Sequence, residues 1–259
     1  MSKRKCVIAP AFEGIREEIE KLPERIEQGE GTVLWNGRNK LIAFEDIAGC
    51  EKTLVVKKFK KLDLFKRIIY TFFRANKAKK SFQNARGLSE RGFDTPEPIA
   101  YIEDYLQGLL HQVYYICEYT DFHPIRERLV DLEPFDRQME KDYARFVVSL
   151  HEKGVIHKDL NNTNVLFAPL TDGHYHFQLI DINRVRFYSG GEKAKDSEWM
   201  ENLTLFADCG EMYTAFVKDY VSFRHLPQSF VADIMKAKLR HDRHWQRKKM
   251  VKRWFKKRH

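Results

Sequence analysis

The chain has 259 residues, of which 43% are hydrophobic and 32% charged, so it can bury a globular core of one large domain or two lobes. It contains no uninterrupted apolar run of about 18 residues, which excludes an ordinary membrane-spanning helix. Its basic N-terminus lacks the apolar segment of a secretory signal, so we expect a cytoplasmic protein. The cysteines are spaced too far apart to indicate a disulfide framework or a zinc site, and we interpret them as thiols: Cys6, Cys50, Cys117 and Cys209.

The first 120 residues are predicted to form a small lobe, a sheet crossed by a helix. Asn36-Gly37 is suited to a tight hairpin turn because both residues tolerate positive φ. Pro23 is expected to break a charged, peripheral first helix, and Gly92 to end a longer one. The predicted elements are a helix over 12–28, strands over 32–35, 40–45 and 53–59, a helix over 63–91 that places Phe82, Ala85 and Leu88 on one face, and strands near 99–103 and 112–119.

The remainder is predicted to be mostly helical, apart from short strands that flank a polar loop. Apolar spacing indicates a helix over 135–153, ended by Gly154. Strand-like residues 165–167 and 176–180 flank a turn at Asp172-Gly173, and a helical pattern resumes near Ser197. This organisation predicts three parts: residues 1–120, 121–235 and 236–259.

The polar loop carries the strongest chemical signal. Residues His157-Lys158-Asp159-Leu160-Asn161-Asn162-Thr163-Asn164 fit the pattern H-x-D-L-x-x-x-N, which kinases use for phosphoryl transfer. Asp181-Ile182-Asn183 ends the following hairpin, where a kinase has its metal-binding D-F-G. Upstream, Val55-Val56-Lys57 stands on the third predicted strand, as V-A-I-K does in kinases. The order, the spacing and the predicted structural context therefore agree at three places.

With these motifs the chain resembles the lipopolysaccharide kinases, the Kdo and heptose kinase family of Gram-negative bacteria. The resemblance extends over residues 33–225 and includes the segments 56–59, 92–101, 155–161 and 179–184. It implies an α+β, bilobal protein-kinase-like fold, with a small antiparallel sheet in the nucleotide-binding N-terminal lobe and a helical catalytic lobe. It also implies an enzyme that uses ATP and Mg²⁺ and a sugar acceptor in lipopolysaccharide.

The resemblance implies a role for each matching residue. Asp159 would align the attacking hydroxyl and take its proton, while Lys57 would bridge the α- and β-phosphates. Asn164 and Asp181 would hold the metal, since Mg²⁺ prefers oxygen ligands. Asn161 would orient the γ-phosphate or a metal-bound water.

Two further predictions concern the residues around these positions. Cys117-Glu118-Tyr119-Thr120 looks like the hinge, in which backbone groups of Glu118 and Thr120 would meet adenine; a plain buried strand is the alternative. His157 is expected to brace the loop rather than to react. Adjacent Lys57 and Lys58 must point to opposite faces of their strand, and we favour Lys57 as the phosphate ligand.

The sequence also departs from the protein-kinase pattern. No glycine-rich loop precedes Lys57, although the hairpin at 36–39 and Gly29-Glu30-Gly31 are candidates. No glutamate occurs where the helical partner of Lys57 is expected, so that ion pair is absent or replaced by Gln83 or Asn84. The segment after Asp181 is too short for a peptide-binding platform, which favours a sugar acceptor. Arg184 and Arg186 are candidates for binding acidic groups of the acceptor, with structural salt bridges as the alternative.

The excess of positive over negative residues lies entirely in the C-terminal tail, residues 236–259, which contains twelve Lys or Arg and one acid. The pairs Met250/Trp254 and Val251/Phe255 give this basic helix an apolar edge, which favours an anionic membrane surface. Nucleic acid, an acidic protein and a packed or solvated helix are the alternatives, and nucleic acid is not expected.

The sequence thus predicts a kinase that phosphorylates a sugar hydroxyl, with Kdo in the inner core of a lipid A precursor as the favoured sugar, and a peripheral location on the inner face of the inner membrane. The alternatives are a kinase of protein or of another small molecule, and a pseudokinase scaffold that binds nucleotide and membrane.

Overall fold

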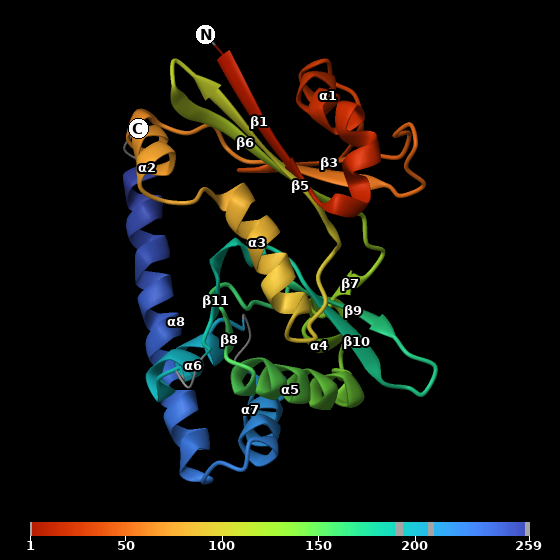
Figure 1. Cartoon of the computed structure of the whole chain (residues 1–259). Helices are drawn as coiled ribbons and strands as arrows, with labels where there is room; N and C mark the ends of the chain where they lie inside the picture. Colours follow the sequence, from red (N-terminus) through yellow and green to blue (C-terminus); the bar gives the residue numbers. More distant parts are fainter. Residues whose placement is uncertain (1, 190–193, 207–209, 257–259) are drawn as a thin grey trace. The chain divides into compact units, whose positions relative to one another are not determined.

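The structure is a computed structural model that describes the chain except residues 1, 190–193, 207–209 and 257–259 (Figure 1). The burial of residue 2 and the side chains of residues 251–256 are also outside the description. The chain divides into two compact units, which we call the first and second unit. The first comprises Met1–Asp121 with Asp181–Arg184, and the second comprises Phe122–Ile180 with Val185–His259.

The first unit is built on a six-stranded sheet with the strand order β1-β5-β6-β4-β3-β2, in which every neighbouring pair is antiparallel. Its strands are β1 (Ser2–Ile8), β2 (Thr32–Asn36), β3 (Lys40–Phe44), β4 (Leu54–Lys58), β5 (Pro98–Leu106) and β6 (Leu109–Glu118). Its helices are η1 (Pro10–Ile15), α1 (Arg16–Glu27), α2 (Leu64–Phe72) and α3 (Lys77–Ser89), and η2 (Ile182–Arg184) belongs to this unit as well.

Alternation along the strands gives this sheet two apolar faces. On β6, Tyr114 and Ile116 pack in one core cluster with α1, whereas Val113 and Tyr115 pack in another with α3. Figure 1 shows α1 and α3 on opposite sides of the sheet. Because successive side chains point to opposite faces, both faces of a central strand such as β6 must be apolar.

Helix α1 differs from the prediction at two points. It runs through Pro23 without a break, and the interruption lies instead at Ile15, where η1 passes into α1. It is also not peripheral, since Ile19 and Leu22 are fully buried against the sheet. The free energy gained by burying this apolar stripe outweighs the one hydrogen bond that a proline removes from a helix. Strand β1, which pairs with β5, was not predicted.

The helix predicted over 63–91 is two helices, α2 and α3. Asp63 and Asn76 each cap a new helix, accepting from the amides of Lys66 and Lys79. In α3 the predicted face is present: Ala85 and Leu88 are buried and Phe82 packs beside Tyr101. The sequence therefore did contain a signal for the break between α2 and α3: a second capping residue, Asn76, lies inside the range predicted as one helix.

The second unit is mostly helical and contains two small antiparallel sheets, with the orders β10-β9-β7 and β11-β8. Its strands are β7 (His123–Pro124), β8 (Val155–His157), β9 (Val165–Pro169), β10 (Tyr175–Leu179) and β11 (Val185–Phe187). Its helices are α4 (Arg126–Leu129), α5 (Arg137–Glu152), α6 (Asp196–Leu203), α7 (Glu211–Phe223) and α8 (Ser229–Lys256).

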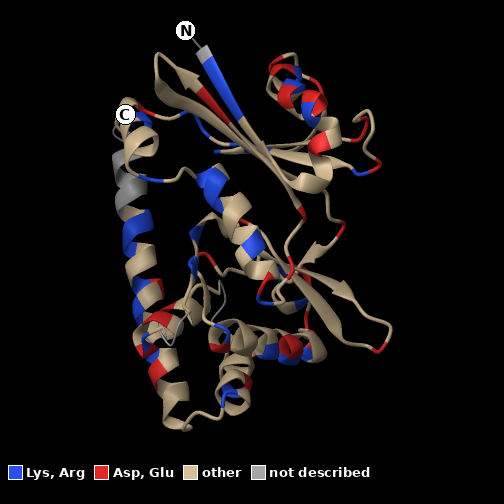
Figure 2. Ribbon diagram, viewed as in Figure 1, with Lys and Arg blue, Asp and Glu red and all other residues tan. Residues whose placement is uncertain are grey.

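The predicted basic tail is the greater part of α8, and its beginning is packed rather than solvated. Ile234 is fully buried, and Lys238 is almost fully buried, with its ammonium donating to the carbonyl of Thr204 at 3.2 Å and to Asp242 at 2.9 Å. Farther along, Trp245 and Met250 are exposed and basic residues follow one another along the helix (Figure 2). The predicted pairs Met250/Trp254 and Val251/Phe255 each include a side chain that lies outside the described part of the chain.

Over the described part of the chain, we find no helix that combines the length and apolar character needed to cross a bilayer. Cys6, Cys50 and Cys117 carry free thiols, and Cys209 lies outside the described residues. Burial raises the pKa of the Cys117 thiol to about 12, which makes it unreactive at neutral pH.

Candidate active site

The predicted catalytic loop, residues 157–164, joins β8 to β9 in the second unit. His157 is fully buried and braces it, as expected. Its Nδ1 accepts from the amide of Asp159 at 3.2 Å, so Nε2 carries the hydrogen and donates to the carbonyl of Ile180 at 3.0 Å. One ring thus ties the loop to the end of β10.

Two asparagine side chains complete the loop by bonding to its own backbone. Asn164 Nδ2 donates to the carbonyl of Asp159 at 2.9 Å, which leaves the amide oxygen as the atom able to meet a cation. Asn161 Oδ1 accepts from the amides of Thr163 and Asn164 at 3.0 and 3.1 Å. The carbonyl oxygen of Asn161 therefore caps the turn, and its NH₂ group is the part suited to contact a phosphate.

Lys57 and Asp181 form an ion pair within the first unit. Lys57 Nζ lies 2.8 Å from Asp181 Oδ1, and the two side chains are 17% and 33% exposed. Asn183 Nδ2 also donates to Oδ1, at 2.6 Å. Asp181 has a φ of +54°, a left-handed conformation that non-glycine residues adopt with strain, and such residues cluster at functional sites.

The lysine next to Lys57 faces the other way. Lys58 pairs with Glu27 of α1, on the sheet face opposite to Asp181. Strand β4 alternates accordingly, because Leu54 and Val56 join the core cluster that contains α1. Of the two adjacent lysines, the structure brings only Lys57 to Asp181.

Helix α3 contains no acidic residue, so it cannot supply a glutamate to Lys57. Asn84 of α3 instead donates to the carbonyl of Ile182 at 2.7 Å and so contacts the segment after Asp181. Gln83, the other predicted substitute, is exposed. The carboxylate that pairs with Lys57 is therefore Asp181 itself.

Lys77, the first residue of α3, is a neighbour of this pair that the sequence analysis missed. Burial and the positive charge of Arg38 lower the pKa of Lys77, while the carboxylate of Asp181 opposes the shift. Lys57 and Arg184 also lower it. The sequence could have indicated Lys77 by its position in the first turn of α3. The helix dipole disfavours a cation there unless an anion binds nearby.

The predicted hinge overlaps the end of β6, because Cys117 and Glu118 are the last two residues of this strand. The amide of Glu118 donates to the carbonyl of Glu97, and its carboxylate pairs with Lys52 at 2.9 Å. The amide of Glu118 is therefore already used within the first unit. Thr120 lies two residues beyond the end of the strand, in irregular backbone.

Arg186 forms the structural salt bridge that was the alternative to acceptor binding. Its guanidinium lies 3.4 Å from Glu198, which also pairs with Lys158 and accepts from Tyr188. Arg184 belongs to the first unit and lies near Lys77.

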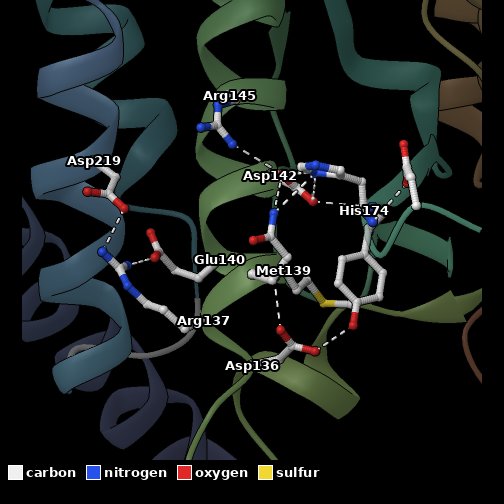
Figure 3. Close-up of polar contacts among 11 residues, drawn as sticks. Asp136, Arg137, Met139, Glu140, Asp142, Arg145, His174 and Asp219 are labelled. Atoms are coloured by element: carbon white, nitrogen blue, oxygen red, sulfur yellow. Dashed lines mark hydrogen bonds and ion pairs between the residues drawn. The ribbon is translucent and has the colours of Figure 1, made fainter. Parts of the chain in front are cut away.

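A polar network fixes the N-terminal half of α5 to the β9–β10 hairpin (Figure 3). Asp142 accepts from His174 at 3.0 Å and from the amide of Tyr175 at 3.2 Å, and the hydroxyl of Tyr175 donates to Asp136 at 2.6 Å. The figure also shows Arg137 between Glu140 and Asp219. Since the loop 157–164 connects α5 with this hairpin by way of β8, the network holds its flanking elements together.

The loop is also supported from behind by a buried chain of hydrogen bonds. Asn202 Nδ2 donates to the carbonyl of His157 at 2.7 Å, and Asn202 Oδ1 lies 2.9 Å from Nε2 of His151. The hydroxyl of Tyr220 lies 2.8 Å from Nδ1 of the same ring. Burial lowers the pKa of His151 to about 4, so the ring is neutral at physiological pH.

Comparison with known proteins identifies the architecture in which these residues sit. Residues 40–207 match the model of the lipopolysaccharide kinase (Kdo/WaaP) family. The chain belongs to this family. A search of curated proteins gave no match to the sequence.

A solved structure described as "WaaP in complex with acyl carrier protein" has the same fold, with a TM-score of 0.60 and 17% identity over 90% of this chain and 97% of that one. The Rio2 kinase from Chaetomium thermophilum aligns with a TM-score of 0.46 and 16% identity, over 86% of this chain and 76% of that one. The predicted protein-kinase-like α+β fold and the predicted family are thereby confirmed.

Membership of a kinase family implies the use of ATP, and a kinase needs a divalent cation to bridge its phosphates. Among the residues that the structure describes, no three His, Cys, Asp or Glu side chains gather as a metal cluster. The donors expected of a kinase are fewer: the carboxylate of Asp181 and the amide oxygen of Asn164, the rest being phosphate and water. Each of these atoms is an oxygen of the kind that magnesium prefers, and within the second unit the Asn164 amide is oriented by its bond to the carbonyl of Asp159.

Proposed function

We propose that this protein transfers the γ-phosphate of ATP to a sugar hydroxyl of the lipopolysaccharide inner core, and that the sugar is Kdo. The observation that carries the proposal is the loop 157–164, in which His157 and Asn164 are both fixed by bonds to the main chain around Asp159. This arrangement fixes the main chain from which the Asp159 carboxylate projects, and it orients the amide oxygen of Asn164, without help from a ligand. Preorganisation of this kind supports phosphoryl transfer.

In this proposal Asp159 accepts the proton of the attacking hydroxyl and aligns the oxygen with the γ-phosphorus. Lys57 would bind the α- and β-phosphates, and Asp181 and Asn164 would each supply an oxygen ligand to the cation. Bound Mg²⁺ neutralises charge on the phosphate oxygens. The ion pair of 2.8 Å supports these roles, because it places the Lys57 ammonium and the Asp181 carboxylate side by side, where a metal–phosphate group would meet both charges.

The remaining predicted residues position the substrate. Asn161 donates its NH₂ group to the γ-phosphate while its carbonyl oxygen continues to cap the turn. The carbonyl of Glu118 accepts from the adenine amino group, and the backbone of Thr120 completes the adenine site.

A sugar is favoured over a peptide as acceptor because the segment after Asp181 is short. Within the second unit, β11 begins at Val185 and pairs with β8, and α6 begins at Asp196. This leaves no length for the activation segment on which protein kinases lay a peptide.

The acceptor is proposed to be membrane-linked and met on the cytoplasmic side of the inner membrane, with the exposed part of α8 attracted to anionic lipid. The basic character of that helix supports this role, at roughly 1 kcal/mol for each Lys or Arg near the lipid. An acyl carrier protein, which accompanies WaaP in its solved structure, is a second candidate partner.

The test is transfer of radiolabelled phosphate from ATP to purified lipid A precursors with and without Kdo, with casein as the peptide control. We expect label on the Kdo-containing precursor alone. Label on casein only would contradict the sugar acceptor. No label on any substrate, with ATP still bound, would favour the pseudokinase, for which the absence of a glutamate from α3 is the supporting observation.

A further inference from the structure

Helix α2 turns Arg67 and Thr71 inward beside Tyr70, which packs on the core cluster of the first unit, while most of its large apolar side chains point outward. An ordinary surface helix buries its apolar stripe instead. Arg67 donates to the carbonyls of Leu106 at 2.7 Å and Leu110 at 3.2 Å. The hydroxyl of Thr71 accepts from the amide of Leu110 at 2.8 Å. These bonds to the β5–β6 hairpin fix the rotation of the helix about its axis.

The outward face is therefore apolar and exposed. None of the residues of α2, all of which are described, is buried. Phe65 is 73% exposed, Phe72 is 67% exposed, and Phe73, just beyond the helix, is 76% exposed. Leu64 and Ile68 lie on the same face, at helical spacing. Contiguous exposed apolar side chains of this size mark an interaction surface rather than ordinary surface variation.

Positive charge surrounds this face. Residues 60–80 contain eight Lys or Arg and a single acid, Asp63, whose carboxylate is already paired with Lys66. Figure 2 shows the first turn of α3, which follows α2, in the colour of Lys and Arg. The first unit thus contains a basic segment of its own, although the net excess of positive charge lies in residues 236–259.

A cavity of about 330 Å³ adjoins the helix within the first unit. Its lining includes Tyr70 of α2 and one acid, Asp63, but its charged side chains are mainly cationic: Arg38, Lys60, Lys61, Lys66 and Lys77. Its volume accommodates a phosphate group with part of the molecule that bears it. Lys77, which lines the cavity, also interacts electrostatically with Asp181 and Lys57 of the same unit.

We propose that α2 is an in-plane membrane-binding helix, which inserts Phe65, Ile68 and Phe72 among acyl chains while the cationic cavity beside it takes the phosphate of an anionic lipid headgroup. This deepens the proposed function, because it names the surface that brings the enzyme to a lipid-linked acceptor. An apolar face with a basic rim is the pattern of interfacial helices, whose binding combines apolar burial with attraction to anionic lipid.

The chemistry of the face disfavours other occupants. Nucleic acid uses basic and aromatic residues but gains little from the protruding aliphatic side chains of Leu64 and Ile68. Two copies of the chain packed through α2 would bring two sets of like charges together. An anionic bilayer satisfies the apolar and the cationic groups at once.

The experiment is co-sedimentation of the full chain with vesicles of phosphatidylcholine alone and of phosphatidylcholine mixed with phosphatidylglycerol. We expect binding to the mixed vesicles and a fall of about tenfold or more in the partition coefficient for the double variant Phe65→Ser/Phe72→Ser. The matched control is Leu132→Ser/Leu170→Ser, which removes two exposed apolar side chains of the second unit and should bind as the parent does. Because all four side chains are exposed, circular dichroism should show every variant folded.

A third variant, Lys60→Gln/Lys61→Gln/Lys66→Gln, tests the cationic cavity and should lower binding to the mixed vesicles severalfold. A fourth, Lys248→Gln/Lys249→Gln, measures the contribution of α8 by itself. Equal binding by the parent and Phe65→Ser/Phe72→Ser would overturn the proposal and would mean that α8, not α2, binds the membrane. So would a parent that ignores both vesicles yet dimerises, or binds acyl carrier protein, through the same phenylalanines.

The result is separable from that of the kinase assay. Phosphorylation of a delipidated, water-soluble acceptor should proceed at the parent rate in Phe65→Ser/Phe72→Ser, while phosphorylation of acceptor in vesicles falls. If no acceptor is phosphorylated by the parent, the proposed function fails, and vesicle binding still decides the role of α2.

Discussion

The two units hold their candidate site residues by different kinds of interaction. In the second unit, His157, Asn161 and Asn164 bond to the main chain of their own loop or of the neighbouring strand. In the first unit, Lys57 and Asp181 bond to each other through opposite charges. The main chain of the loop is therefore organised without a ligand, whereas in the proposed function the ion pair would have to exchange its partners for phosphate and metal. A preorganised group contributes to the chemical step, and a group that must exchange contributes to binding as well.

The largest effect is expected at Asp159. Replacing Asp159 with Ala should lower kcat by about a thousandfold, since the carboxylate acts only on the transferring proton and its hydroxyl. The affinity for ATP should change little, because the loop keeps His157 and Asn164 in place. Transfer rates and nucleotide titration calorimetry would measure the two quantities. Asp233→Ala, an exposed acid of α8, is the control, and equal turnover in Asp159→Ala and parent would refute the role.

The adjacent lysines provide the next test, because they differ only in the face of β4 on which they lie. Lys57→Met should lower kcat/KM for ATP by about a hundredfold, through loss of a charge-assisted phosphate contact. Lys58→Met removes a pair with Glu27 on the other face and should cost no more than a fewfold. Steady-state kinetics with varied ATP decides between them. A greater loss in Lys58→Met would reverse the assignment of the two faces.

A pH dependence of stability is expected from His151, the buried ring behind the loop. Its pKa is lowered to about 4 in the folded protein, from 6.5 for the free side chain. Between these values the unfolded chain binds a proton that the folded chain does not. The free energy of unfolding should therefore fall as the pH is lowered from 7, by about 2 kcal/mol at pH 5, and level off below pH 4.

Urea denaturation of the parent and of His151→Gln at several pH values would isolate this contribution. The variant should lose that part of the slope, whereas His244→Gln, at an exposed position on α8, should keep it. Identical slopes in the parent and His151→Gln would show that the ring is not held neutral.

The smallest effect is expected at Asn161 and separates its two roles. Asn161→Ala should lower the free energy of unfolding by about 1 kcal/mol, through loss of the capping oxygen. Asn161→Asp keeps that oxygen and should restore stability, but it lacks the NH₂ group proposed to reach the γ-phosphate. Thermal melts combined with kinetics would measure both. Full turnover in Asn161→Asp would leave Asn161 a purely structural residue.

The contrast between the helices α3 and α2 explains which predictions from sequence could succeed. Periodicity located the buried face of α3 at Ala85 and Leu88, because that helix follows the usual rule of apolar residues inward. The same rule cannot say that α2 faces outward, since its rotation is set by Arg67 and Thr71 bonding to a hairpin some forty residues away in the chain. The prediction of a break at Pro23 was wrong for a related reason. Burial of Ile19 and Leu22 against the sheet stabilises α1, although a proline inside a helix weakens it locally.

The sequence alone determined the family, the identity of the loop and most of the elements, β1 and the break between α2 and α3 excepted, because these depend on residue types at short spacings. Only the tertiary structure decided that Asp181 is the carboxylate paired with Lys57, that Lys58 belongs to α1, and that Lys77 adjoins this pair. Each of these facts joins residues more than fifteen positions apart in the chain. Such pairs are chosen by the packing of the sheet and its helices, and no local pattern in the sequence records them.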